Sequence, residues 1–282
     1  MSDKKVCLIT GATSGIGKAT LLSLARQGMS IVMVSRNKEK GESVRAPITN
    51  KTRNENIHLA IADLSSQQDI RKLAGDIKSK YSKLDILVNN AGGIFDKRIL
   101  TFDGLELTFA LNHLAYFLLT NLLLEILKAA PAGRVVNVSS QAHRYGSMEF
   151  DDTGFEKGYN AMKSYAQSKL ANLLFTYELS RHLAGTGITA NALHPGAVRT
   201  GFGKDLSGIA GFVFKRFDFL MRSPEKGAET VIWLASSAEP EQLTGKYFCD
   251  RRELRSSRVS HDRDVAKRLW EASAQMTGLG FH

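Results

Sequence analysis

Short β-rich apolar runs alternate with longer helical patterns along most of the chain, and this alternation constrains the fold most strongly. Runs such as 30–35 and 84–89 are largely apolar, which is typical of strands buried on both faces of a sheet. The segments between the runs are long enough to be crossover helices, which parallel strands require. Right-handed crossovers then predict an α/β fold with a doubly wound, Rossmann-type parallel sheet.

The pattern predicts seven strands with helices on both faces of the sheet. The expected strands are 5–10, 30–35, 57–62, 84–89, 133–139, 188–194 and 247–249. The expected helices are 16–27, 66–81, 105–128, 159–184 and 224–236. No repeat or low-complexity linker divides the chain, so we predict one domain over residues 1–282, with 251–282 as a C-terminal extension.

Composition excludes several classes of protein. With 43% hydrophobic and 23% charged residues, whole-chain disorder, collagen and coiled coil do not fit. No apolar run approaches the ~20 residues of a membrane span, and we expect no signal peptide. Cys7 and Cys249 are far apart in apolar stretches, which favours buried, reduced thiols and a cytoplasmic location. No metal-binding spacing is present, so we predict no metal site.

The net charge of +10 raises the question of a nucleic-acid partner. The densest basic stretch, 251–268, holds seven Lys/Arg against three acids. It lacks the interleaved aromatic residues that a base-stacking surface needs. A solvated helical face is therefore the favoured interpretation, and we predict no nucleic-acid partner. General attraction for anionic ligands, including a phosphate-bearing cofactor, remains.

A glycine-rich turn follows the first expected strand and opens a helix. It reads Thr10-Gly11-Ala12-Thr13-Ser14-Gly15-Ile16-Gly17. Glycines let the backbone approach a pyrophosphate, and a helix N-terminus favours negative charge. The turn therefore predicts a dinucleotide site, although glycine-rich turns also occur without one.

The end of the second expected strand bears on which dinucleotide binds. It reads Ser35-Arg36-Asn37, with an arginine where an NAD site would carry an acid. A guanidinium forms forked hydrogen bonds to a 2′-phosphate. We therefore expect NADP(H) rather than NAD, with an exposed surface arginine as the alternative interpretation of Arg36.

Tyr165 and Lys169 are candidate catalytic residues because an i, i+4 pair shares one helix face. An ammonium nearby should lower the pKa of the phenol, which is ordinarily about 10, and so favour general acid/base work. Tyr159 and Lys163 have the same spacing. We favour Tyr165, because Tyr159 follows a glycine at the expected start of the helix.

Small polar residues end two further strands at the edge where open α/β sheets bind ligands. Ser139 and Ser140 end the fifth strand, and Asn89 and Asn90 end the fourth. A hydroxyl there can hydrogen-bond a substrate carbonyl or alcohol. For Ser139-Ser140 alone, a strand-ending turn is the simpler alternative.

Together these motifs resemble the short-chain dehydrogenase/reductase family over about residues 5 to 250. The matching motifs are Thr10-Gly11-x3-Gly15-Ile16-Gly17, Asn89-Asn90-Ala91-Gly92, Ser140, Tyr165-x3-Lys169 and Pro195-Gly196-x-Val198-x-Thr200. Leu111-Asn112-His113-Leu114, Val138-Ser139-Ser140-Gln141-Ala142-His143 and His194-Pro195-Gly196 look most like the retinol dehydrogenase-like branch. The acid-rich insertion 148–158 suits that branch and is expected to form a loop beside the site.

The resemblance implies a role for each matching residue. Tyr165 would exchange a proton with the substrate oxygen, Lys169 would bind the nicotinamide ribose and lower the tyrosine pKa, and Ser140 would orient the carbonyl. Asn112 would support a proton relay through water. The residues expected to contact the cofactor are Gly11, Thr13, Ser14, Gly15, Ile16, Gly17, Ser35, Arg36, Asn37, Asp63, Leu64, Asn90, Ala91, Gly92, Tyr165, Lys169, Pro195, Gly196, Val198 and Thr200.

The segment 201–223 is dense in aromatic and aliphatic residues and suggests a lid for a hydrophobic substrate. A core-packing helix, a dimer contact or a peripheral membrane contact are the alternatives. The predicted function is NADP(H)-dependent interconversion of an apolar, retinal- or steroid-like carbonyl and its alcohol, by a homodimer or monomer. A non-catalytic NADP-binding sensor or scaffold is the alternative, against which the complete set of Ser140, Tyr165 and Lys169 argues.

Overall fold

One mixed sheet forms the centre of the computed structural model, which describes residues 4–198 and 221–280. The sheet has eight strands in the order β3-β2-β1-β4-β5-β6-β7-β8. The strands are β1 Val6–Ile9, β2 Ser30–Ser35, β3 Ile57–Ile61, β4 Ile86–Asn89, β5 Arg134–Val138, β6 Thr189–Leu193, β7 Tyr247–Cys249 and β8 Arg252–Glu253. Neighbours from β3 through β7 pair in parallel, so their carboxyl ends share one edge.

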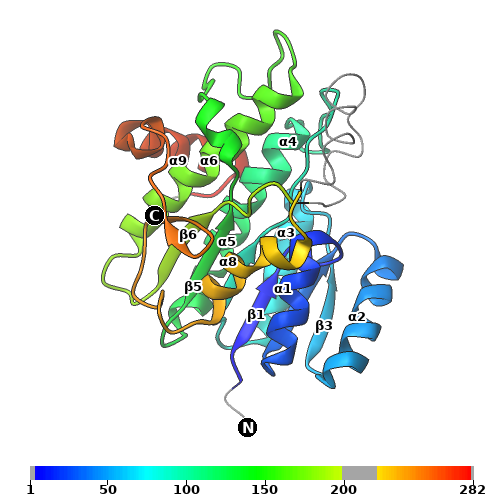
Figure 1. Ribbon diagram of the computed structural model, residues 1–282. Helices are drawn as coiled ribbons and strands as arrows, with labels where there is room; N and C mark the ends of the chain where they lie inside the picture. Colours follow the sequence, from blue (N-terminus) through cyan, green and yellow to red (C-terminus); the bar gives the residue numbers. More distant parts are fainter. Residues whose placement is uncertain (1–3, 199–220, 281–282) are drawn as a thin grey trace.

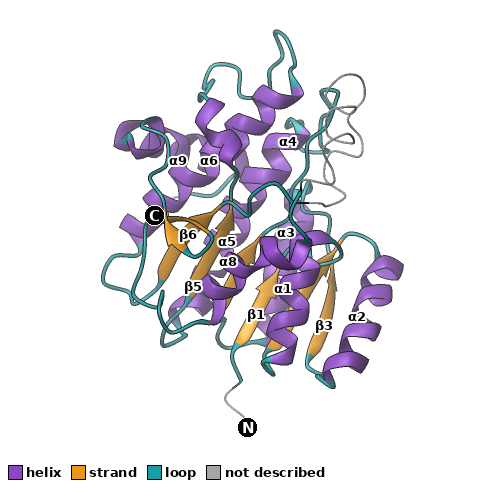
Figure 2. Ribbon diagram, in the orientation of Figure 1, coloured by secondary structure: helices purple, strands orange, loops and turns teal. Residues whose placement is uncertain are grey.

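Helices cover both faces of the sheet (Figures 1 and 2). They are α1 Gly15–Arg26, α2 Lys38–Thr52, α3 Gln67–Lys80, α4 Leu107–Phe109, α5 Ala115–Lys128, α6 Ala161–His182, α8 Pro224–Ser236 and α9 Arg263–Thr277. Side chains of α1, α2 and α8 share one apolar cluster with the sheet, and those of α3, α5, α6 and α9 share the other. The predicted doubly wound α/β fold is thereby confirmed.

The predicted number of strands is wrong by one. The additional strand β8 pairs antiparallel with β7 across a two-residue turn. The turn residues Asp250 and Arg251 have φ angles of 50° and 62°. Two consecutive positive φ angles are the conformation of a tight hairpin turn that usually carries glycine or asparagine. No such residue marks this turn in the sequence.

The basic stretch 251–268 is not one helical face, contrary to the prediction. Its first residues form β8 and a 3₁₀ turn at Val259–His261, and α9 begins only at Arg263. The Asp262 carboxylate accepts hydrogen bonds from the backbone N–H groups of Asp264 and Val265, at 3.0 and 3.1 Å. This side-chain cap sets the start of the helix.

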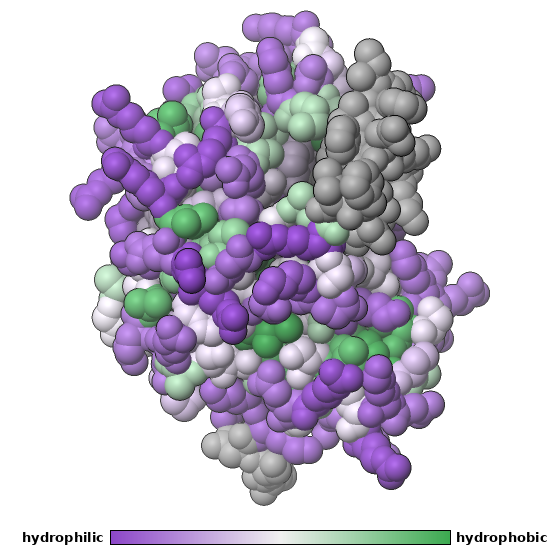
Figure 3. Space-filling model, viewed as in Figure 1, coloured by the Kyte–Doolittle hydropathy of each residue, from purple (hydrophilic) through white to green (hydrophobic). Residues whose placement is uncertain are grey.

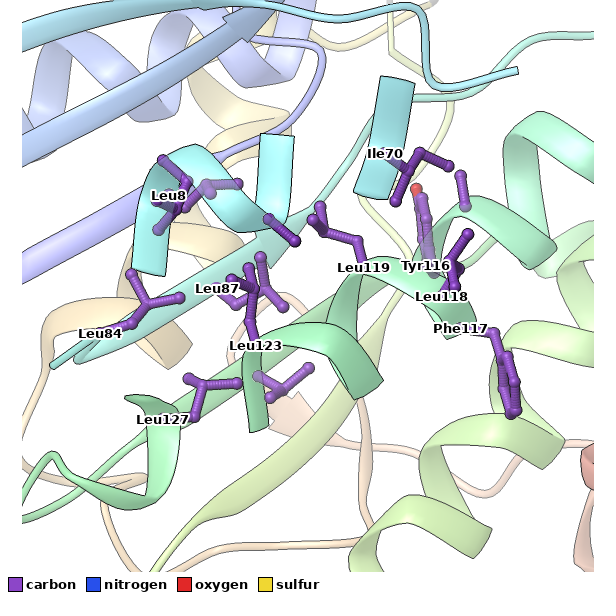
Figure 4. Packing of buried hydrophobic residues seen from close by; sticks show 14 of the residues in the cluster. Leu8, Ile70, Leu84, Leu87, Tyr116, Phe117, Leu118, Leu119, Leu123 and Leu127 are labelled. Atoms are coloured by element: carbon purple, nitrogen blue, oxygen red, sulfur yellow. The ribbon is translucent and has the colours of Figure 1, made fainter. Parts of the chain in front are cut away.

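Helix α5 lies against the sheet through a row of leucines. Leu119, Leu123 and Leu127 pack in one buried cluster with Leu87 of β4 and with Leu84, which precedes that strand (Figure 4). The helical stretch Leu107–Lys128 is long and apolar enough to cross a membrane by length and composition, contrary to the expectation that no apolar run is long enough. In this structure 72% of its apolar window is buried, so packing inside the protein accounts for the composition.

Two other expectations concern the cysteines and the lid. Cys7 and Cys249 are both free and buried, as predicted. The expected lid at 201–223 lies outside the described residues apart from its last three.

Over the face shown in Figure 3 the described surface is mostly hydrophilic, and apolar residues form small separate areas.

Replacing Leu123 with alanine tests the packing of α5 on the sheet. The side chain is fully buried, so the variant should lose about 2–5 kcal/mol in free energy of unfolding, measured by urea denaturation. Leu254, which is exposed, provides the control: its alanine variant should change that free energy by about 0.5 kcal/mol or less. Equal effects of the two substitutions would contradict the packing described.

Candidate functional site

The turn after β1 is joined to the end of β4 by hydrogen bonds. The Thr10 hydroxyl accepts from the backbone N–H groups of Asn90 and Ala91, at 2.8 and 3.0 Å. The Asn90 amide donates to the carbonyls of Thr10 and Gly11, at 2.8 and 3.2 Å. Strand order reverses between β1 and β4, and open α/β sheets bind ligands at that point.

Two glycines of this turn are required, because neighbouring atoms leave no room for a Cβ and because one of them has a positive φ angle. Gly11 has a φ of +65°, and a Cβ on it would lie 2.9 Å from the Asn90 amide nitrogen. A Cβ on Gly17 would collide with the Gly11 carbonyl oxygen. The tight turn therefore tolerates no side chain at either position.

The start of α1 fits the phosphates of a dinucleotide. Its N-cap residue Ser14 makes no side-chain capping bond, and the first turn contains no acid. The N–H groups there remain available to an anion, which the helix dipole also favours. The side-chain caps Asn37, Ser66, Asn160, Ser223 and Asp262 close the N-termini of α2, α3, α6, α8 and α9. The predicted residues from Gly11 to Gly17 thus form a cradle that suits a pyrophosphate.

Beyond β2, two of the three predicted residues shape the turn. The Ser35 hydroxyl donates to the Asn37 carbonyl at 2.8 Å, and the Asn37 side chain accepts from Lys40 N–H at 2.8 Å. Arg36 between them is exposed. Its guanidinium is therefore positioned at the carboxyl end of β2 with no acid beside it in the sequence.

The predicted residues after β3 have structural partners. Asp63 accepts from the backbone and hydroxyl of Ser65, at 2.9 and 2.7 Å. Its own N–H donates to Asp69 at 2.9 Å. Leu64 is buried in the core cluster. These residues hold the turn after β3 at the same sheet edge, so a cofactor contact there remains a prediction.

Helix α6 and the end of β5 are locked by reciprocal hydrogen bonds. Lys169 Nζ donates to the Val138 carbonyl at 3.1 Å, and the Ser139 hydroxyl donates to the Lys169 carbonyl at 2.8 Å. Lys169 Nζ lies 5.6 Å from the centroid of the Tyr165 ring. A hydrogen bond also links the Tyr165 and Ser140 side chains. The structure thus brings together three of the four predicted catalytic residues.

Burial shifts the pKa values of both Tyr165 and Lys169. The pKa of Tyr165 is raised, whereas the sequence predicts that it is lowered. Burial raises the pKa of Tyr165 to about 12, while the hydrogen bond with Ser140 acts in the lowering direction. It lowers the pKa of Lys169 to about 7, because a buried ammonium loses its hydration. Burial is thus the dominant influence on the Tyr165 pKa, and the partly neutral amine of Lys169 does not offset it.

The fourth predicted catalytic residue, Asn112, lies in a π-helical turn at Ala110–Leu114. Its amide donates to Gly93 O and to Ser168 Oγ, both at 2.9 Å, and accepts from Gly93 N–H at 2.8 Å. A Cβ on Gly92 would lie 2.8 Å from the Asn112 carbonyl oxygen. Local π-turns often occur at functional sites, and this one joins the segment after β4 to α6 beside Tyr165.

The segment after β6 packs against α1 and α8. Gly196 has a φ of +82°, and its N–H donates to His194 Nδ1 at 3.1 Å. A Cβ added to Gly227 of α8 would touch both Val198 and Ile16, so these two predicted residues lie close together. Pro195 precedes this turn, and Thr200 lies outside the described residues.

The second Tyr-x3-Lys pair has a structural role. The Tyr159 hydroxyl donates to the Phe95 carbonyl at 2.9 Å and lies 3.1 Å from Thr108 Oγ1. Nearby, the buried Glu106 carboxylate accepts from the Ser164 hydroxyl at 3.0 Å and caps α4. Glu106 is a supporting residue that sequence reasoning missed, because a single glutamate before a helix gives no sign of burial.

The insertion 148–158 forms turns that pack on α6 and α9, as the expectation of a loop implies. Glu149 N–H donates to the Gln167 side chain at 2.8 Å, and Gln167 donates to the Thr153 carbonyl at 2.9 Å. The Arg268 guanidinium lies 4.3 Å from the Phe150 ring centroid. The loop is therefore held against the helix that carries Tyr165.

The buried Lys169 predicts a specific dependence of stability on pH. Its pKa falls from 10.5 in the unfolded chain to about 7 in the folded protein. Between these values the unfolded state binds the extra proton, so stability rises with pH across this window. Relative to a Lys169→Met variant, wild type should gain up to about 1.4 kcal/mol per pH unit between pH 7 and 10. Urea denaturation at several pH values measures the difference, and a flat difference would contradict the burial of a titrating amine.

Comparisons with known proteins identify the family of this chain. A sequence model described as short chain dehydrogenase matches residues 5–208. Retinol dehydrogenase 13 of Homo sapiens is 43% identical over 282 residues, which is 98% of this chain and 85% of the relative. An uncharacterized protein from Mycobacterium paratuberculosis has a TM-score of 0.79 at 33% identity, covering 99% of this chain and 95% of that one. The NADPH-dependent reductase YwfH of bacilysin biosynthesis has a TM-score of 0.70 at 25% identity, covering 88% and 97%. The chain therefore belongs to the short-chain dehydrogenase/reductase family, in its retinol dehydrogenase-like branch.

Proposed function

We propose that this oxidoreductase uses NADP(H) to interconvert an apolar aldehyde or ketone and its alcohol. The observation that carries the proposal is the convergence of Ser140, Tyr165 and Lys169 at the carboxyl end of β5. A hydroxyl pair beside a buried amine can bind a carbonyl oxygen and supply a proton to it. The retinol named for the human relative is an apolar alcohol, which supports this substrate class.

The preference for NADP(H) rests on the end of β2. Arg36 is exposed there, and its forked donors suit a 2′-phosphate. The structural relative YwfH is an NADPH-dependent reductase, which supports the same preference. The cradle of Gly11 and Gly17 and the uncapped start of α1 would receive the pyrophosphate.

The chain's own residues would handle the proton and the substrate oxygen. When bound, the nicotinamide supplies or accepts the hydride. Tyr165 keeps its proton at neutral pH because burial raises its pKa to about 12, so its hydroxyl can donate to a carbonyl oxygen. Ser140 donates a second hydrogen bond to that oxygen, and Lys169 binds the ribose. Asn112 holds the Gly93 backbone and α6 in place beside them.

Some expectations stay predictions. They are the hydrophobic lid at 201–223, the cytoplasmic location, the monomer or homodimer state and the peripheral membrane contact. The sensor or scaffold alternative is separated from the enzyme by an NADPH oxidation assay over a panel of apolar aldehydes and ketones. Turnover of any member supports the enzyme.

Replacing Tyr165 with phenylalanine should lower kcat about 100- to 10,000-fold, because the variant has no proton to transfer. NADPH binding, measured by fluorescence titration, should be unchanged. Tyr159→Phe is the matched control, since it loses a single hydroxyl whose partners are the Phe95 carbonyl, the Thr108 hydroxyl and the Glu106 carboxylate. Its kcat should equal that of wild type. A Tyr165→Phe enzyme with wild-type kcat would refute the assignment.

Replacing Arg36 with alanine should weaken NADPH binding by about 10- to 100-fold, because a charge-assisted hydrogen bond contributes about 1.5–3 kcal/mol. NADH binding should be unaffected, since NADH has no 2′-phosphate. Arg45 provides the control, because its guanidinium on α2 already pairs with Glu42 at 2.8 Å. Equal loss of both dinucleotides in Arg36→Ala would argue against recognition of the phosphate.

A further inference from the structure

His143 is a fully buried histidine whose two ring nitrogens both have partners. It belongs to the 3₁₀ helix Gln141–Tyr145, which begins directly after Ser140. Its Nδ1 lies 2.7 Å from the Ser140 carbonyl oxygen, and its Nε2 lies 3.1 Å from the backbone nitrogen of Ser257. Because a backbone N–H can only donate, Nε2 is the acceptor. Nδ1 therefore carries the hydrogen and donates it to Ser140.

The surroundings keep this imidazole neutral. Burial lowers the pKa of His143 to about 4, and the nearby Arg144 and His194 act in the same direction. The ring packs edge-on against Tyr247, with centroids 5.1 Å apart and an interplanar angle of 77°. One tautomer and one ring orientation are thus held across the ordinary pH range.

Ser140 is restrained on both sides by this arrangement. Its carbonyl accepts from His143 Nδ1 and from the His143 backbone N–H at 3.2 Å. Its hydroxyl oxygen accepts from Ala142 N–H at 3.2 Å. The same hydroxyl is hydrogen-bonded to the Tyr165 side chain, so it is held between the Ala142 N–H and the proposed proton donor.

The segment 255–261, which supplies the Ser257 N–H, is itself anchored. The Ser256 hydroxyl lies 2.7 Å from the Tyr177 hydroxyl of α6 and 2.9 Å from His261 Nε2. The Arg144 guanidinium donates to the Arg255 carbonyl at 2.6 Å. The C-terminal part of the chain is therefore fixed to α6 and to the helix that follows Ser140.

We propose that His143 is a positioning residue for Ser140, and that the segment 255–261 supports the active site through it. The imidazole links the Ser257 N–H to the Ser140 carbonyl and thereby sets the direction of the Ser140 hydroxyl. This inference rests on the proposed carbonyl–alcohol activity. It gives the basic C-terminal stretch a role in holding the site, although its cations do not touch Ser140.

Three substitutions of His143 separate its two hydrogen bonds. Phenylalanine keeps a ring against Tyr247 and loses both bonds. Asparagine places its amide near the Nδ1 position and can still donate to Ser140, whereas glutamine reaches the Nε2 position and can still accept from Ser257. His182→Phe is the matched control, because that ring stacks on Trp270 at 4.3 Å and lies outside the segment 255–261.

The measurements are kcat and KM for a reactive apolar aldehyde, the Kd of NADPH by fluorescence, and the melting temperature. We expect kcat to fall about 10- to 100-fold in H143F and H143Q, since small displacements of a positioned group have effects of this size. H143N should recover most of the loss. The Kd of NADPH should stay within about twofold in every variant, and H182F should retain wild-type kcat.

Two results would overturn the inference. Wild-type kcat in H143F would show that Ser140 needs no such support, and equal losses in H143N and H143Q would show that the bond to Ser140 is not the one that matters. Should H143F fail to fold, the comparison of kcat between H143N and H143Q still tests the inference. Failure of the proposed function looks different, since wild type itself would then bind NADPH and reduce no carbonyl.

Discussion

The reciprocal hydrogen bonds between Lys169 and the end of β5 hold the site together. One bond runs from the Lys169 amine to the Val138 carbonyl, and the other runs from the Ser139 hydroxyl back to the Lys169 carbonyl. They fix the depth and rotation of α6 relative to the sheet. Tyr165 lies one helical turn earlier on the same face, so it is brought against Ser140. The remaining parts of the site, from the glycine turn to the π-turn of Asn112, are arranged around this junction.

The same burial that makes the junction rigid determines its chemistry. A buried amine loses hydration, and a buried phenol resists ionisation. The protein on its own therefore presents a protonated Tyr165 beside a Lys169 that is half charged near pH 7. This state suits proton donation to a carbonyl better than proton removal from an alcohol.

Sequence reasoning reached the fold and most of the site because both depend on local patterns. Strand bounds at 30–35 and 247–249 match the structure, since β-rich runs buried on both faces are unmistakable. Helix α2 was missed because its pattern is weak. It is polar, contains Pro47, and buries only Gly41, Val44 and Ile48.

Other features depend on contacts between distant segments. The spacing of Tyr165 and Lys169 predicts their common face and says nothing about burial, so the predicted direction of the tyrosine pKa was wrong. The hydrogen bond between His143 and Ser257 joins residues 114 positions apart. The tight turn at Asp250 contains no glycine from which it could be predicted. Such features become visible only once the chain is folded.

The central claim is that this protein moves a hydride between a reduced nicotinamide and an apolar carbonyl carbon. The most direct test incubates it with NADPH carrying two deuterium atoms at the reactive carbon of the nicotinamide, together with a retinal-like or steroid-like aldehyde or ketone. The account predicts an alcohol product with one deuterium on the carbinol carbon, detected by mass spectrometry. NADPH binding without any deuterium in the product, across the whole panel of carbonyls, would contradict it.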